Sequence, residues 1–280
     1  MELIQSILMG IVQGLSEFLP ISSSAHLVFT SNFYKVFKGI EIVQETNQEV
    51  FLDIMLHIGT LIAVLIYFRK DILNIIKALY VGIKTKDYNS KDFKLGLYII
   101  SGTIITVLIA FPLSEVAEIL VFTPHIVGGL LIITGFILLL SEFISKKIKD
   151  SKPIGFKNSC IIAIAQGLAA LPGFSRSGLT IAAGLMTGSD RMTAANYSFL
   201  LSIPIILGAS IFYPILKIDF QEVLTYNWTA IIVGTIVSAI VGYLCIKYFL
   251  KFLSKFSLAI FGYYCLTVGI ITAVFFTFYK

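Results

Sequence analysis

The sequence predicts an all-α polytopic membrane protein with six transmembrane helices and two re-entrant helix-turn-helix hairpins in an inverted-topology repeat. Three observations support this fold class. Of the 280 residues, 57% are hydrophobic and 13% are charged, and the mean hydropathy is +0.93, which is far more apolar than a soluble domain needs to be. Six apolar runs approach the length of ~20 residues that spans a bilayer. Two further apolar regions are interrupted in the middle, and their interruptions resemble each other.

The charge pattern between the apolar runs gives the orientation. The six continuous spans that we predict are 51–68, 95–112, 126–143, 196–216, 229–248 and 257–278. Lysines and arginines concentrate in the loops 69–94 and 144–157 and between the last two spans, whereas 113–125 has none and 217–228 has only Lys217. The positive-inside rule therefore places the basic loops in the cytoplasm and the other two loops outside. The net charge of +5 reflects this topology, and we expect no nucleic-acid partner.

The two interrupted regions, about 3–30 and 158–188, are predicted as re-entrant hairpins. A residue before a proline avoids helical geometry, so Pro20 and Pro172 each end a half-helix. The serine-rich tracts that follow suit the N-cap of a second half-helix. Such breaks are tolerated at membrane depth only where protein or a water-filled cavity surrounds them. Each hairpin should therefore lie inside the protein.

Counting spans from the cytoplasmic loops sets the direction of each hairpin. The 3–30 hairpin enters from the outer face and the 158–188 hairpin from the inner face. We therefore divide the single membrane domain, 1–280, into two halves of opposite topology, 1–150 and 151–280. Inverted repeats with discontinuous helices place their binding site near the midplane, at the repeat interface.

The breaks of the two hairpins carry a repeated motif. Residues 13–26 read QGLSEFLPISSSAH and residues 166–178 read QGLAALPGFSRSG. The first copy contains Glu17 and His26, and the second contains Arg176. Ionisable groups inside membrane segments are costly and by default mark function. We expect the carboxylate and the guanidinium to meet at the interface, either in a site or as a purely structural pair.

These residue types fit phosphoryl chemistry. The free N–H groups at a helix N-terminus bind phosphate, and a guanidinium can clamp phosphate oxygens with two hydrogen bonds. We predict four catalytic residues, which are Glu17, Ser23, His26 and Arg176. The predicted substrate-binding residues are Gln13, Ser22, Ser24, Ser175, Ser177 and Gly178. Acid, hydroxyl, imidazole and arginine would then converge on one membrane pocket.

Other polar residues have alternative interpretations. Asp53 and His57 are four residues apart on the first span, so they share a face of the helix. Either both line the mouth of the pocket, or Asp53 only stabilises the N-terminus of the helix. We expect His125 to be structural in an outer loop. Asp190 and Arg191 should hold the second hairpin at the cytoplasmic interface.

At the two motifs the sequence resembles the undecaprenyl-diphosphate phosphatase family, also called bacitracin-resistance proteins. The segments that carry the resemblance are Gln13-x-x-x-Glu17, LPISSS at 19–24 with His26, LPGFSRSG at 171–178, LHIGTL at 56–61 and SFLLSIP at 198–204. They occur in order across nearly the whole chain. Many family members carry Glu where this chain has Gln13, and commonly Gly where it has Ala25.

The resemblance implies hydrolysis of undecaprenyl or another polyprenyl diphosphate to the monophosphate and inorganic phosphate. This reaction recycles the lipid carrier of cell-wall and surface-glycan synthesis and gives bacitracin resistance. The resemblance also implies a divalent cation, Mg²⁺ or Ca²⁺, and a multi-pass protein of the plasma membrane whose active site faces outside. The expected partners are the lipid substrate and membrane lipids; the oligomeric state, including a homodimer, is left open.

The mechanism that we expect uses Ser23 as nucleophile with His26 as its base, and attack by water or by His26 are the alternatives. Glu17 would either bind the cation or handle protons. A function of another class is a polyprenyl-phosphate flippase or transporter, because inverted repeats with broken helices are typical of transporters.

Overall fold

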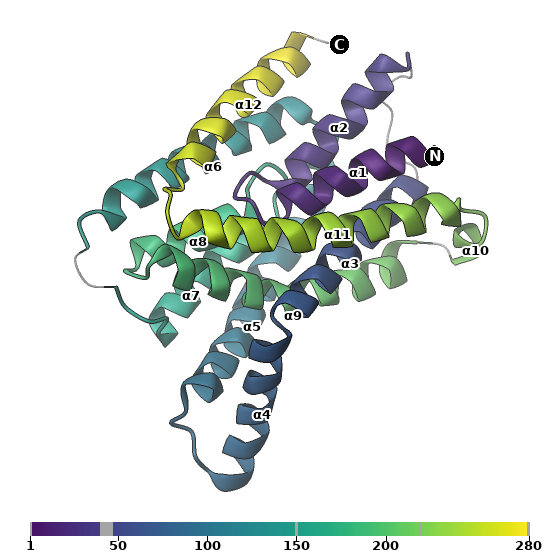
Figure 1. Ribbon diagram of the computed structural model, residues 1–280. Helices are drawn as coiled ribbons and strands as arrows, with labels where there is room; N and C mark the ends of the chain where they lie inside the picture. The colour runs from purple at the N-terminus through teal and green to yellow at the C-terminus, as the bar shows by residue number, and fades with distance from the viewer. Residues whose placement is uncertain (1, 40–46, 149–150, 219, 279–280) are drawn as a thin grey trace.

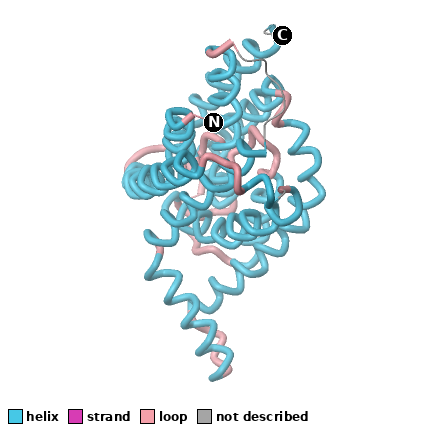
Figure 2. Tube along the Cα trace, turned by 90° about the vertical axis from the view of Figure 1, so that its right-hand side faces the viewer, coloured by secondary structure: helices cyan, strands magenta, loops and turns pink. Residues whose placement is uncertain are grey.

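The computed structural model describes residues 2–39, 47–148, 151–218 and 220–278, which form helices and turns without a strand among them (Figure 2). The helices are α1 (Leu3–Ser16), α2 (Ser23–Phe37), α3 (Asn47–Tyr67), α4 (Arg69–Thr85), α5 (Lys91–Leu120), α6 (Pro124–Ser145), α7 (Phe156–Leu168), α8 (Arg176–Met186), α9 (Arg191–Lys217), α10 (Phe220–Val223), α11 (Trp228–Leu253) and α12 (Ala259–Phe278). The all-α prediction is confirmed for this part of the chain.

Six of these helices are long and apolar enough to cross a membrane, namely α3, α5, α6, α9, α11 and α12. Each contains one predicted span or nearly all of it. Their most apolar windows have mean hydropathies between 2.0 and 2.3. The chain is therefore a multi-pass membrane protein, as predicted from its apolar runs.

The predicted outer loop 113–125 is wrong, because most of it is helical. Helix α5 is 30 residues long and continues through Pro112 to Leu120. A proline removes one backbone donor, and membrane helices tolerate this loss when their surroundings satisfy the freed carbonyl. Helix α6 then begins at Pro124, so His125 lies in the first helical turn instead of a loop.

The predicted basic loop 69–94 is also mostly helical, since α4 occupies its first part. Lys70, Lys77 and Lys84 recur every seven residues, which places them on one face of a helix. Ile75 on another face is buried. Helix α4 packs along α5, and the pair projects away from the rest of the molecule (Figure 1). Because an amphipathic helix has no continuous apolar run, the apolar runs of the sequence did not predict α4.

Glycines bring the backbones of α6 and α12 close together, and Figure 1 shows the two helices side by side. A Cβ at Gly128 would lie 2.9 Å from the carbonyl oxygen of Gly269, and one at Gly135 would lie 2.8 Å from that of Gly262. Small residues at such crossings allow the close packing that holds membrane helices together. This pair forms one wall around the broken helices.

Both interrupted regions are broken where the sequence predicts. Helix α1 ends at Ser16 and α2 begins at Ser23, whereas α7 ends before Pro172 and α8 begins at Arg176. The first region is longer than predicted, because α2 continues to Phe37. Next to the first break, the ring of Phe18 is fully buried, and its centroid lies 5.3 Å from that of Phe199 on α9. Aromatic packing thus fixes the break against the second half of the chain.

Candidate active site

Two serines cap the helices that follow the breaks, and they make the same hydrogen bonds. The Ser22 hydroxyl oxygen accepts a hydrogen bond from the backbone N–H of Ala25 at 3.3 Å, and that of Ser175 accepts one from Gly178 at 3.0 Å. Each cap serine also contacts the hydroxyl of the serine two residues later, at 3.2 and 3.3 Å respectively. The backbones differ, because φ is 69° at Ser22 and −85° at Ser175. The repeated motif therefore gives a capped helix N-terminus at each break.

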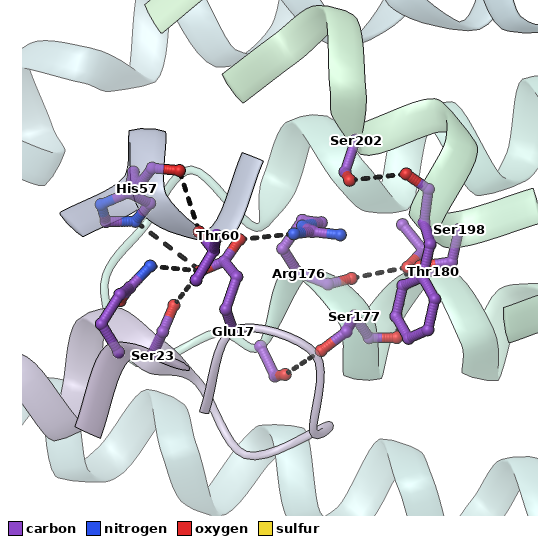
Figure 3. Close-up of polar contacts among 12 residues, drawn as sticks. Glu17, Ser23, His57, Thr60, Arg176, Ser177, Thr180, Ser198 and Ser202 are labelled. Atoms are coloured by element: carbon purple, nitrogen blue, oxygen red, sulfur yellow. Dashed lines mark hydrogen bonds and ion pairs between the residues drawn. The ribbon is translucent and has the colours of Figure 1, made fainter. Parts of the chain in front are cut away.

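The carboxylate of the first motif meets the guanidinium of the second, as predicted (Figure 3). Nη2 of Arg176 donates to Oε1 of Glu17 at 2.5 Å. Arg176 is the first residue of α8, and Glu17 follows directly after α1, so the ion pair joins the two breaks. Glu17 is only 6% exposed. The pair is thus withdrawn from bulk water at the centre of the molecule.

The other oxygen of Glu17 is the meeting point of three further side chains. Oε2 accepts hydrogen bonds from Nε2 of Gln13 at 2.9 Å and from the Ser23 hydroxyl at 2.8 Å. Nε2 of His57 on α3 lies 3.7 Å from the same oxygen (Figure 3). One carboxylate therefore organises residues from α1, α2, α3 and α8.

Two polar atoms beside Glu17 have no hydrogen-bond partner in the described structure. They are Oε1 of Gln13 and Nη1 of Arg176, and both are buried. A buried donor or acceptor without a partner costs roughly 1–3 kcal/mol, and more when the group is charged. Such groups in a native structure call for an explanation, of which an absent ligand is one. The free Nη1 donor would suit an anion.

The expected hydrogen bond between Ser23 and His26 is not formed, because each side chain has other partners. Ser23 is the first residue of α2, and its hydroxyl reaches back across the break to Glu17. His26 turns the other way: its Nδ1 contacts the carbonyl oxygen of Ser22 at 2.8 Å, and its Nε2 contacts the Tyr264 hydroxyl of α12 at 2.8 Å. Because a carbonyl only accepts, Nδ1 carries the proton, and Nε2 accepts from Tyr264 when the ring is neutral.

The serines predicted to bind substrate mainly build the two helix ends. Ser22, Ser175 and Ser177 are each no more than 2% exposed. The Ser177 hydroxyl donates to the carbonyl oxygen of Leu19 at 2.9 Å and so ties α8 to the first break. A Cβ at Gly178 would lie 2.9 Å from that of Ser175, so glycine leaves room for the cap. These residues orient the backbone N–H groups of the two helix ends. Of the serines predicted to bind substrate, Ser24 alone is half-buried instead of buried.

The sequence analysis left Tyr264 out of this cluster and placed His57 at the pocket mouth only as one of two alternatives. His57 shares a motif with the predicted family, and its spacing of four from Asp53 was the available signal. Tyr264 lies among several aromatic residues near the end of the chain, and its ring stacks on that of His26 with centroids 5.7 Å apart. Nothing in its local sequence indicates this contact.

The donor set fits a divalent cation that shares its ligands with a substrate. Glu17 offers carboxylate oxygen, and Gln13 offers the unpartnered amide oxygen; hard cations such as Mg²⁺ and Ca²⁺ prefer oxygen ligands of this kind. The described residues hold no group of three His, Cys, Asp or Glu side chains that could bind an ion unaided. Mg²⁺ is usually held by one or two carboxylates together with substrate phosphates and water.

Comparisons with known proteins show the family of this chain. The family described as "Bacitracin resistance protein BacA" matches residues 6–271. An undecaprenyl-diphosphatase of Methanobrevibacter smithii is 41% identical over 280 residues, covering 97% of this chain and 96% of the relative. One of Halothermothrix orenii is 39% identical and covers 98% of both chains. Undecaprenyl-diphosphatase 1 of Pseudoalteromonas translucida is 35% identical and covers 99% of this chain and 100% of its own. The chain therefore belongs to the bacitracin resistance protein BacA family.

Proposed function

We propose that the protein is an integral membrane phosphatase that hydrolyses undecaprenyl or another polyprenyl diphosphate to the monophosphate and inorganic phosphate. The activity recycles the lipid carrier for cell-wall and surface-glycan synthesis and gives bacitracin resistance. The names of full-length relatives support the activity. The observation that carries the proposal is the Glu17–Arg176 pair between two helix N-termini, with an unpartnered guanidinium nitrogen beside it.

The proposed setting is the plasma membrane, with the site open to the outer face. The pairs α1–α2 and α7–α8 are re-entrant, and the halves 1–150 and 151–280 are inverted repeats of one membrane domain. Helix packing supports this arrangement, because α1 packs on α11 whereas α7 packs on α5. In the two halves α1 corresponds to α7, and α5 corresponds to α11. A two-fold axis between the halves would therefore turn the α1–α11 contact into the α7–α5 contact. The basic loops support the outward direction.

The diphosphate head group binds where the two helix N-termini converge, while its polyprenyl chain stays in lipid between the spans. Backbone N–H groups at the starts of α2 and α8 bind phosphate oxygens. Nη1 of Arg176 supplies a further donor, because it is buried and makes no hydrogen bond among the described residues. These groups also stabilise the charge that develops on the transferred phosphoryl group.

Ser23 is the proposed nucleophile. Its oxygen attacks the terminal phosphorus, the bond from that phosphorus to the bridging oxygen breaks, and polyprenyl monophosphate leaves. Water then cleaves the Ser23 phosphate ester and releases inorganic phosphate. The hydroxyl already donates to Glu17, which replaces His26 as the acceptor of its proton. Phosphoryl transfer depends mainly on positioning and electrostatics, so orientation by Glu17 is the larger contribution.

Gln13 and His26 complete the proposed site. Glu17 and Gln13 would hold the divalent cation, whose charge would offset that of the phosphates. His26 remains a proposed catalytic residue because it lies in the first turn of α2, where Ser22 and Tyr264 hold its ring.

The test is phosphate release by the purified protein in detergent, with undecaprenyl diphosphate as substrate. We expect inorganic phosphate and undecaprenyl monophosphate in equal amounts, with a large loss of rate in EDTA that added Mg²⁺ or Ca²⁺ restores. Absence of phosphate release, combined with transfer of polyprenyl phosphate across the bilayer of reconstituted vesicles, would overturn the proposal in favour of a flippase.

A further inference from the structure

We propose that His57 is a further protein ligand of the divalent cation, beside Glu17 and Gln13, and that it favours Mn²⁺ over Mg²⁺ and Ca²⁺. The inference rests on the proposed function only for the presence of a cation at Glu17. It adds a ligand from α3, a helix outside both broken pairs. It also predicts which cations the site prefers.

The first step is which nitrogen of the His57 ring faces Glu17. Its Nδ1 lies 2.7 Å from the backbone carbonyl oxygen of Asp53, one helical turn earlier. Because a carbonyl oxygen only accepts, Nδ1 carries the hydrogen. In the neutral ring Nε2 is then a free lone pair, and it is the atom turned toward Glu17. Histidines that bind metals almost always donate their other ring N–H in this way.

The second step is the distance between the two donor atoms. Nε2 of His57 and Oε2 of Glu17 are 3.7 Å apart, which is too long for a hydrogen bond. Metal ions keep about 2.0–2.2 Å to such nitrogen and oxygen ligands, so one ion can touch both atoms. The His57 side chain is 32% exposed, whereas that of Glu17 is 5% exposed. An ion can therefore enter from the His57 side.

The third step is whether Glu17 has room for an ion. Arg176 uses Oε1, so the guanidinium and the ion would occupy different oxygens of the carboxylate. Oε2 accepts from Gln13 and Ser23. Loss of the Gln13 bond alone leaves a lone pair for the ion. Oε1 of Gln13 has no partner in the described structure, so rotating this amide toward an ion breaks no other hydrogen bond.

Two contacts with α11 hold the turn of α3 that carries His57. Ser238 of α11 donates to the carbonyl oxygen of Leu56, and the α11 backbone at Thr235 meets Gly59. Arg176 faces Glu17 from α8 and contacts the carboxylate oxygen that His57 does not face. The packing therefore keeps Nε2 of His57 beside Oε2 of Glu17, where an ion can join them.

The proposed ligand set has a consequence for metal choice. Mg²⁺ and Ca²⁺ bind oxygen ligands. Mn²⁺ shares their preference for carboxylate oxygen but is also the first of the divalent transition metals whose affinity rises at sites that contain nitrogen, so a histidine beside a carboxylate should favour it over Mg²⁺. The wild-type protein should therefore bind Mn²⁺ more tightly than Mg²⁺. Replacement of His57 by glutamine, which offers only an amide oxygen, should reduce this preference.

The experiment uses Mn²⁺ and the detergent-purified full-length protein without substrate. Electron paramagnetic resonance measures the bound and free ion, and its pulsed form detects ¹⁴N of a coordinated imidazole. We expect the imidazole signal in the wild type, and its loss in His57→Gln with about tenfold weaker Mn²⁺ binding. His125→Gln is the matched control, because this exposed histidine of α6 lies outside the cluster; His26→Gln tests the other nearby ring.

The His125→Gln and His26→Gln variants should both keep the imidazole signal. An imidazole signal that persists in His57→Gln, that disappears in His26→Gln, or that is absent from the wild type would overturn the inference. His57→Asn guards against misfolding, because its amide can still donate to Asp53 but offers no imidazole; it should elute as one species and lack the signal. If the wild-type protein gives the imidazole signal but releases no phosphate, the proposed function is contradicted and the proposed metal site is supported.

Discussion

Two carboxylate–arginine pairs join distant helices in the described part of the chain, and they differ in how fully each is satisfied. Arg191 binds Glu142 through two nitrogens, Nε at 2.8 Å and Nη2 at 2.6 Å. The backbone N–H of Leu258 donates to the same carboxylate at 2.8 Å. Arg176 contacts Glu17 through one nitrogen, and its Nη1 is buried without a partner.

The comparison teaches that a buried ion pair alone does not mark a site. The Glu142–Arg191 pair ties α6, α9 and the start of α12 together, and its fork-to-fork geometry uses the carboxylate fully. The Glu17–Arg176 pair lies between two helix N-termini and keeps unused donor and acceptor atoms. Unused hydrogen-bonding capacity, rather than charge or burial, separates the proposed site from the structural pair.

The largest expected difference between the two pairs comes from replacing each arginine by lysine. Arg176→Lys should lower kcat by about 10²-fold or more, because a point charge cannot replace the directed guanidinium donors. Arg191→Lys should leave kcat of the folded protein within a few-fold and lower its melting temperature. Phosphate-release kinetics and thermal melts in detergent check both. Near-normal turnover of Arg176→Lys would contradict a phosphate clamp.

The next effect concerns the two residues that the structure separates. Ser23→Ala should lower kcat by at least about 10²-fold and abolish any phosphoserine that can be trapped by acid quench, since attack is proposed to occur there. His26→Ala should cost less, because His26 contacts Ser22 and Tyr264 instead of Ser23. If Ser23→Ala retains substantial turnover while His26→Ala has none, serine is not the nucleophile.

Removing the acid of the structural pair should affect stability and not chemistry. Glu142→Ala leaves the buried Leu258 N–H without its acceptor, and an unpaired buried donor costs about 1–3 kcal/mol. The Arg191 side chain is 33% exposed, so water can replace part of its lost contact. Chemical denaturation should show this loss, while the rate per folded molecule stays near that of the wild type. An unchanged free energy of unfolding would show that the pair contributes little.

The smallest effect is expected at the start of α9, beside the structural pair. Asp190 caps this helix; burial raises the pKa of its carboxyl, but hydrogen bonds from Thr193 and Ser151 outweigh this and hold the pKa below its ordinary value. The cap therefore stabilises the fold above that ordinary value, and the effect is lost as the pH falls through the lowered pKa. Asp190→Ala should cost about 1 kcal/mol at neutral pH. Equal costs at neutral and strongly acidic pH would contradict this assignment.

The sequence predicts the Glu17–Arg176 contact because both residues lie in matched motifs whose prolines and serines set the local geometry. It also predicts the six spans, since each is a continuous apolar run. The spans need only about 20 neighbouring residues each, whereas the contact needed the comparison of two motifs 159 residues apart and the opposite topology of the two halves. The same prolines and serines located the breaks in α1–α2 and α7–α8.

Contacts set by tertiary packing could not be predicted in this way. The direction of the His57 ring depends on how α3 packs beside the first break, and Tyr264 reaches His26 across 238 residues of sequence. The partner of Arg191 is Glu142 on α6, which lies in no recognisable sequence motif and so could not be identified in advance. Pro112 reads as a helix end, yet α5 continues beyond it. For His57, Tyr264 and Arg191, a distant helix decides the outcome.

The most direct test of the central claim compares removal of the two acids in one phosphate-release assay. Glu17→Ala should insert into the membrane and elute as a folded protein, yet show no cation-stimulated release of phosphate from undecaprenyl diphosphate. Glu142→Ala should release phosphate at near the wild-type rate per folded molecule. Cation-stimulated hydrolysis that survives in Glu17→Ala would contradict the account, because the carboxylate that joins the two broken helices would then be dispensable.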